Sequence, residues 1–152
     1  MASARYQRER DMKGLLSIVT LLVASSAYGQ LNPDQECTLH GAVAWAITQV
    51  HAQGMTKAEA IEGIQTVLFS EEALPDWMRR LIDDTVNEVY DYDPVDARAY
   101  RAYKIEACHQ RLLGRDPGKS FAEVHHELSM CGNLESFEEI TECAKRAARG
   151  LG

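Results

Sequence analysis

The sequence predicts an all-α protein: a four-helix antiparallel bundle with a two-helix C-terminal extension, braced by disulfides. Apolar residues recur near the 3.6-residue period of an α-helix, and capping sequences precede these runs. No segment alternates convincingly with the period of a β-strand or carries an Asn-Gly or Asp-Gly hairpin turn. The connections are short, so we expect neighbouring helices to pack antiparallel.

The first 29 residues have the order of a secretory signal peptide. Basic residues precede an uncharged stretch with an apolar centre from Leu15 to Val23, and small residues follow up to Gly29. This stretch is too short to span a bilayer, which needs about 20 residues. We therefore expect cleavage after Gly29, a periplasmic or secreted location, and no stable membrane insertion of residues 30–152.

Two capping sequences define the first two helices. Residues 32–35 have the pattern of an N-cap, a proline at the first helical position and a capping-box glutamine, which predicts a helix to about Gln53 before the stop at Gly54. A second capping box, residues 56–59, predicts a helix that ends near Ser70.

The third and fourth helices each begin near a proline. Pro75 restarts the chain and predicts a helix to about Tyr90. Residues 93–96 repeat the order of cap, proline and acidic first turn, which predicts that Asp93 caps a fourth helix ending near Leu113.

Two further capping boxes, residues 120–123 and 136–139, predict the last two helices, which end near Met130 and Arg149. No linker is long enough to demand a second domain. We therefore expect one exported domain with a four-helix core and a C-terminal helical hairpin, residues 30–114 and 115–152.

The four cysteines form an even set in an exported chain, and sequence alone permits three pairings. Cys37 and Cys108 are expected at the same end of an up-down bundle, so a bond between them is geometrically natural. It would close a loop of about 70 residues, worth roughly 4 kcal/mol. Cys131 and Cys143 remain, but a simple hairpin would leave them about 9 Å apart along the helix axis. Only a splayed or crossed arrangement closes that gap, so this second pairing stays open.

The chain after the predicted signal peptide is strongly acidic. Removing the first 29 residues takes away four of the 16 basic and two of the 23 acidic residues, which moves the net charge from −7 to −9. Such a surface repels nucleic acid and favours a basic partner.

A cluster of carboxylates marks the end of the predicted third helix. Carboxylates near a helix C-terminus are mildly unfavourable, which suggests that these residues are used in binding. The candidate partner-binding residues are Asp83, Asp84, Glu88, Asp91 and Asp93, with Tyr90 and Tyr92 in the same turn.

A metal site is a second possibility. Glu123 and His126 lie about one helical turn apart and could bind a divalent ion with a distant residue such as His109; the alternative is a solvated helix face. No nucleotide-binding, nucleophile-elbow or zinc-protease motif occurs, so we expect no cofactor and no enzymatic activity. An acid pair, Asp83 and Asp84, is the remaining catalytic alternative.

Over residues 32–108 the chain carries a series of single residues and short motifs in a fixed order: Cys37, Gly54, Met55, Thr56, Trp77, Val86, Val89, Tyr90, Tyr100 and Cys108. This order resembles a group of small exported bacterial helical proteins of uncharacterised function. Those proteins share a cysteine in the first helix, a Gly-x-Ser/Thr opening to the second and a cysteine closing the fourth. The chain is also similar to the acidic helical immunity proteins that neutralise periplasmic toxins. The resemblance implies a fold and a compartment but no activity, and the chain after Cys108 departs from it.

These observations favour an exported, non-enzymatic interaction module that binds a protein or peptide, with an immunity or inhibitor role as the sharpest version. The alternative is a periplasmic carrier of a small ligand or metal. That carrier would use either the tyrosines between residues 90 and 103 or the pair Glu123 and His126.

Overall fold

The computed structural model describes residues 31–68, 75–92, 95–115 and 119–151. The predicted signal peptide and Asp93 lie outside these ranges. The described chain contains six helices and no strand, so the all-α prediction is confirmed. The helices are α2 (Pro33–Ala52), α3 (Lys57–Leu68), α4 (Asp76–Tyr90), α5 (Ala97–Leu112), α6 (Phe121–Cys131) and α7 (Phe137–Ala148).

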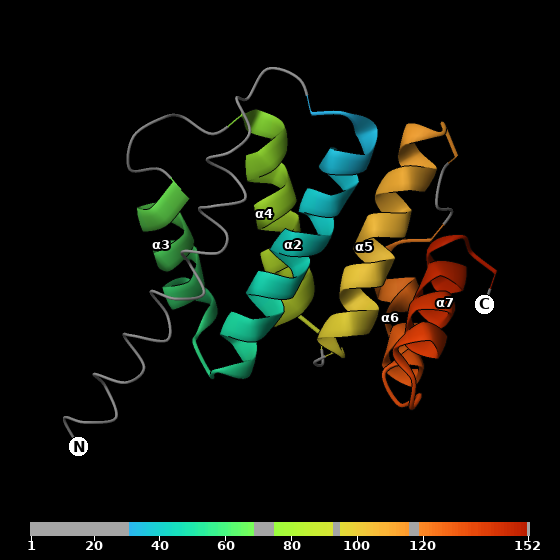
Figure 1. Ribbon diagram of the computed structural model, residues 1–152. Helices are drawn as coiled ribbons and strands as arrows, with labels where there is room; N and C mark the ends of the chain where they lie inside the picture. Colours follow the sequence, from blue (N-terminus) through green and yellow to red (C-terminus); the bar gives the residue numbers. More distant parts are fainter. Residues whose placement is uncertain (1–30, 69–74, 93–94, 116–118, 152) are drawn as a thin grey trace.

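The antiparallel helices α2 and α5 form the centre of the molecule (Figure 1). Helix α4 packs on α2, and α7 packs on α5, so α5 lies between α2 and α7. Helix α6 covers α7 and part of α5, while α3 lies at the edge against α2 and α4. Helix α5 therefore has two main packing partners, α2 and α7.

The capping boxes form as the sequence predicts. Asn32 and Gln35 exchange backbone-to-side-chain hydrogen bonds of 3.0 and 2.9 Å at the start of α2. Equivalent boxes open α3, α6 and α7, and each satisfies amide groups that the first turn of a helix leaves unpaired. Gly54 and Gly114 follow α2 and α5 with φ values of 76° and 68°, a left-handed conformation that favours glycine.

The predicted start of the fourth helix is wrong. Asp96, rather than Asp93, is the N-cap of α5, and its side chain accepts hydrogen bonds from the backbone amides of Arg98 and Ala99. The Arg98 guanidinium also pairs with Asp96, at 2.9 Å between Nη2 and Oδ2. The hydrogen bond from the Arg98 side chain is the main cause that holds the pKa of Asp96 below its usual value, and the two backbone hydrogen bonds add to it.

Close contact and a disulfide join α2 to α5. Cys37 bonds to Cys108 with a Cα–Cα distance of 5.3 Å, as expected, and we call this bond the α2–α5 disulfide. One turn further along α2, Gly41 faces Ile105 so closely that a Cβ atom would lie 2.5 Å from Ile105 Cγ1. His40 is buried beside this contact. Burial, followed by the positive charges of neighbouring cations, lowers the pKa of His40 to about 4.

A second bond, the α6–α7 disulfide, joins Cys131 to Cys143 with a Cα–Cα distance of 5.6 Å. Cys131 is the last residue of α6, whereas Cys143 lies in the middle of α7. The end of α6 therefore meets the middle of α7, and the two helices do not form a simple hairpin in register. At the end of α6, Gly132 approaches the start of α5, since a Cβ atom there would lie 2.6 Å from Asp96 Cβ.

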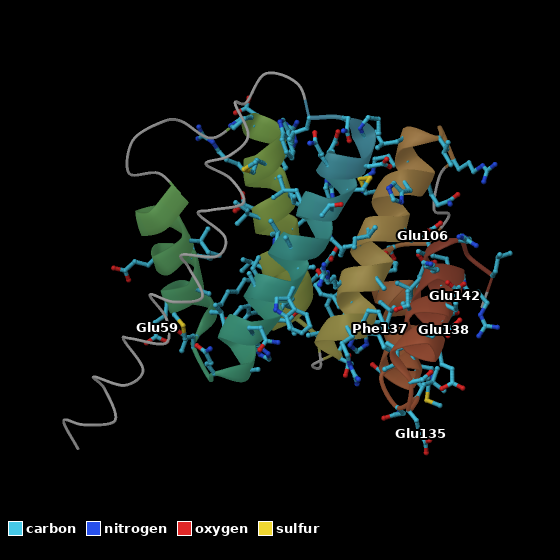
Figure 2. All side chains as sticks on the ribbon, viewed as in Figure 1. Glu59, Glu106, Glu135, Phe137, Glu138 and Glu142 are labelled. Carbon is cyan, nitrogen blue, oxygen red and sulfur yellow. A yellow bond between two sulfur atoms is a disulfide. The ribbon has the colours of Figure 1, made fainter. Side chains whose placement is uncertain are left out.

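Helix α7 is also held to α5 by a buried carboxylate. Glu106 of α5 accepts hydrogen bonds from Arg149 Nε at 2.8 Å and from Gln110 Nε2 at 2.6 Å, and it lies between α5 and α7 (Figure 2). Burial alone would raise the pKa of Glu106, but the hydrogen bonds from Arg149 and Gln110 outweigh it and lower the pKa.

Two disulfides indicate an oxidising, extracellular type of environment. Across the described ranges, every helix is too short or too polar to cross a membrane.

Candidate functional site

An open groove of about 300 Å³ lies between the C-terminal half of α4 and the start of α6. One wall comes from α4 and the turn that follows it, and the other from the first residues of α6 and its N-cap. The lining residues are Asp84, Asn87, Glu88, Asp91, Tyr92, Ser120, Phe121 and Ala122.

The wall from α4 is acidic because its carboxylates follow the helical repeat. Asp84, Glu88 and Asp91 are spaced by four and three residues, so they lie on one face of the helix and its C-terminal cap. Asp84 is exposed and has no ion-pair partner among the described residues, whereas Asp91 pairs with Lys57 of α3 at 2.7 Å. The Lys57–Asp91 pair is exposed, so it is weak and open to competition by another cation.

Glu88 lies deeper and is held by α5. Its Oε2 atom accepts a hydrogen bond from the Tyr100 hydroxyl at 2.5 Å and pairs with Lys104 Nζ at 2.8 Å. Burial, followed by the negative charge of Glu88, raises the pKa of Tyr100, so its hydroxyl stays protonated and donates to the carboxylate. Glu88 therefore links α4 to α5 through side chains and is less available to a ligand than Asp84.

Aromatic rings join the two walls. The Tyr92 ring lies 5.2 Å from the Phe121 ring, edge to face, and 5.4 Å from the His125 ring. Phe121 is buried against Tyr100 and Tyr103 as well, so it anchors the start of α6 to the core. Tyr92 is 39% exposed, which leaves part of its ring open to a ligand in the groove.

A small void of about 10 Å³ adjoins the groove and shares Glu88 and Phe121 with it. Its other lining residues include Thr48, His51 and Tyr100. This volume accommodates about one water molecule and no larger ligand.

The structure brings together Asp84, Glu88, Asp91 and Tyr92 of the predicted partner-binding residues. Asp83 is exposed but does not line the groove. Tyr90 lies elsewhere: its ring packs edge to face on His51 of α2 at 4.7 Å. Its hydroxyl is buried and has no hydrogen-bond partner among the described residues. Burial, followed by the charge of Glu59, raises the pKa of Tyr90.

The predicted metal pair has a different arrangement. Glu123 closes the capping box of α6, where its Oε2 atom accepts hydrogen bonds from the Ser120 amide at 2.6 Å and the Ser120 hydroxyl at 2.7 Å. His126 is exposed. In the described part of the chain, the group of three potential metal ligands that comes together is Glu36, His40 and Cys108, with ligand atoms within 4.8 Å of one another.

Sequence reasoning missed the second wall of the groove. Ser120 and Phe121 open a helix that begins some 30 residues after α4 ends, and no local pattern shows that this helix start lies beside α4. Lys57 and Lys104 were missed for the same reason, since each reaches its carboxylate across two elements that are distant in the sequence.

Comparisons with known proteins give no family to set beside this geometry. No protein-family model matches the chain, and neither the curated proteins nor the solved structures contain a significant match.

Proposed function

We propose that this chain is an exported, non-enzymatic interaction protein that binds a basic segment of a protein or peptide in the groove between α4 and α6. The observation that carries the proposal is the meeting of Asp84 and Asp91 with the ring of Tyr92 in one open groove. Carboxylates beside an exposed aromatic ring suit an arginine or lysine side chain, which gains both ion pairing and cation–π contact.

Charge supports the same partner chemistry. The chain has a net charge of −7, so its field attracts cationic partners and speeds their association. Within this proposal, the chain acts after export in the periplasm or outside the cell, and an immunity or inhibitor role is its sharpest form. We also propose that α2 to α5 form a four-helix antiparallel unit, extended by α6 and α7.

A peptide-binding assay tests the proposal. The probe is a fluorescein-labelled arginine- and lysine-rich peptide, with a glutamate-rich peptide of the same length as its control. We expect binding of the basic peptide alone, with affinity that falls as ionic strength rises. Asp84→Asn and Tyr92→Ala should each weaken binding about two- to fivefold, the range of an exposed ion pair or cation–π contact.

Two further variants separate the groove from general acidity. Asp83→Asn removes the same charge from the adjacent residue outside the groove and should leave the affinity nearly unchanged. Lys57→Met should strengthen binding about two- to fivefold, because it frees Asp91 from its intramolecular cation. Equal weakening by Asp83→Asn and Asp84→Asn would assign the attraction to overall charge, and absence of binding would reject the proposal.

The carrier alternative has less support in the tyrosine region. The void beside Tyr100 has room for about one water molecule. Tyr103 is buried, and burial raises its pKa to about 12. Tyr100 and Tyr103 therefore act as core residues, and the void beside Tyr100 is too small for a ligand larger than water.

A further inference from the structure

The start of α2 and the end of α5 bring four metal-ligating side chains together. Glu36, Cys37 and His40 lie within two turns of α2, and Cys108 faces them from α5. Ligand atoms of Glu36, His40 and Cys108 lie within 4.8 Å of one another, and the fourth residue, Cys37, is covalently joined to Cys108.

Helical spacing directs these side chains toward α5. Glu36 and His40 are separated by four residues, and Cys37 and His40 by three, so all three lie along one side of α2. The relative exposures of Cys37, His40 and Cys108 are 0%, 6% and 2%, while Glu36 is half-buried at the rim. The cluster is therefore enclosed, with a carboxylate at its opening to solvent.

In the oxidised chain the two sulfur atoms are bonded to each other at 2.06 Å. A thiolate, unlike a disulfide sulfur, is a strong zinc ligand. We propose that reduction of the α2–α5 disulfide converts this cluster into a four-coordinate zinc site made of Cys37, Cys108, His40 and Glu36. Two thiolates, one imidazole and one carboxylate are all ligands that zinc accepts in tetrahedral sites.

The reaction balances with a dithiol as reductant. The dithiol transfers two electrons and two protons to the Cys37–Cys108 bond and becomes a disulfide itself, which leaves two thiols on the protein. Zn²⁺ then displaces both thiol protons to solvent. Zinc–sulfur bonds of about 2.3 Å place two sulfur ligands about 3.8 Å apart in a tetrahedron, a separation that rotation of the two cysteine side chains helps to reach.

The two states of the cluster exclude each other and join the same helices. In an oxidising compartment the disulfide links α2 to α5, and under reducing conditions zinc takes its place. A chain that has not yet been oxidised would thus keep the central helix pair together, and oxidation would release the metal.

Cobalt titration of the full chain tests the site, because Co²⁺ replaces zinc and thiolate ligation gives it a charge-transfer absorption band. The natural chain is reduced with dithiothreitol, separated from it under nitrogen and titrated with Co²⁺, then with Zn²⁺. We expect one equivalent of Co²⁺ with a thiolate band, displacement by Zn²⁺, and no such band for the oxidised chain. Absence of the band from the reduced chain would overturn the proposal.

Matched variants assign the ligands. Replacing Cys37 and Cys108 by serine should abolish the thiolate band, whereas replacing the cysteines of the α6–α7 disulfide should preserve it. Loss of an outer partner of a metal ligand costs 10- to 100-fold in affinity, so His40→Ala should weaken cobalt binding by at least about tenfold. His126→Ala, at an exposed histidine outside the cluster, should have no effect.

Glu36→Gln provides a second test, since the half-buried rim position tolerates an isosteric change without threatening the fold. Its expected effect is also at least about tenfold, with circular dichroism confirming an unchanged helix content. Unchanged cobalt affinity in both His40→Ala and Glu36→Gln would show that the thiols bind metal without this cluster, and would refute the assignment.

Discussion

Replacing Gly41 with alanine should have two opposing effects of similar size on the free energy of unfolding. Alanine is a better helix former than glycine by about 1 kcal/mol, so the change should stabilise α2 if nothing else intervenes. However, the new Cβ atom would lie 2.5 Å from Ile105 Cγ1, 2.6 Å from Ile105 Cδ1 and 3.2 Å from Arg101 Cγ. Extra methyl groups in a well-packed interface cost about 1–3 kcal/mol.

The steric cost should therefore outweigh the gain in helix propensity, and Gly41→Ala should lower the free energy of unfolding by up to about 2 kcal/mol. Gly63→Ala is the matched control. Gly63 lies within α3, where an added Cβ would meet nothing within 4 Å, so the control should gain stability by up to about 1 kcal/mol. The difference between the changes in unfolding free energy of Gly41→Ala and Gly63→Ala isolates the effect of the contact between α2 and α5.

Urea unfolding followed by circular dichroism measures both variants, and a double variant tests the cause. Ile105→Val removes the Cδ1 atom, so combining it with Gly41→Ala should recover part of the loss, a positive coupling that double-mutant analysis detects. If Gly41→Ala stabilises the chain as much as Gly63→Ala, the close approach of the two helices at this point is refuted.

The two disulfides should differ in value: their sequence separations of 71 and 12 predict losses of about 4.4 kcal/mol for the α2–α5 disulfide and about 2.8 kcal/mol for the α6–α7 disulfide in the chain-entropy model. Urea unfolding of the two double cysteine-to-alanine variants compares them, and the reverse ranking would contradict the estimate. Asp96→Ala should cost about 1 kcal/mol through loss of the α5 cap. Because the folded pKa of Asp96 lies below its unfolded value of 3.8, the stability that its charge adds is present above pH 3.8 and lost as the pH falls through the folded value. The unfolding free energies of Asp96→Asn and of the natural chain should therefore converge as the pH falls. A difference that stays constant with pH would argue against the Asp96–Arg98 pair. Glu106→Gln should cost about 1–2 kcal/mol by weakening the hydrogen bonds to α7, with Arg149→Met giving a similar loss; a loss confined to one partner would contradict the pairing.

Local features of the fold follow from the sequence because they depend on neighbouring residues. A capping box needs two side chains three residues apart, and all four predicted boxes form. The α2–α5 disulfide was also predictable, since an up-down order places Cys37 and Cys108 at one end. The start of α5 was misjudged because Asp93 and Asp96 both precede a helical pattern, and the repeated Pro motif favoured the wrong one.

Relations between distant elements could not be read from spacing. The packing of α7 on α5 depends on Glu106 and Arg149, which are 43 residues apart, and neither carries a local signal for the other. The acidic half of the candidate groove was predictable from its helical repeat in α4. Tyr92, in the turn after α4, was predictable with it. The wall from α6 was not, because it depends on where the start of α6 lies relative to α4.

The order of the cysteines along the chain has a consequence for cleavage. The two covalent loops, closed at residues 37 and 108 and at residues 131 and 143, follow one another without overlap. A single backbone cut between residues 38 and 107 leaves the oxidised molecule in one covalent piece. A cut after the exposed Arg115 instead divides it into two fragments. The second fragment then stays attached only through the noncovalent packing of α6 and α7 on α5.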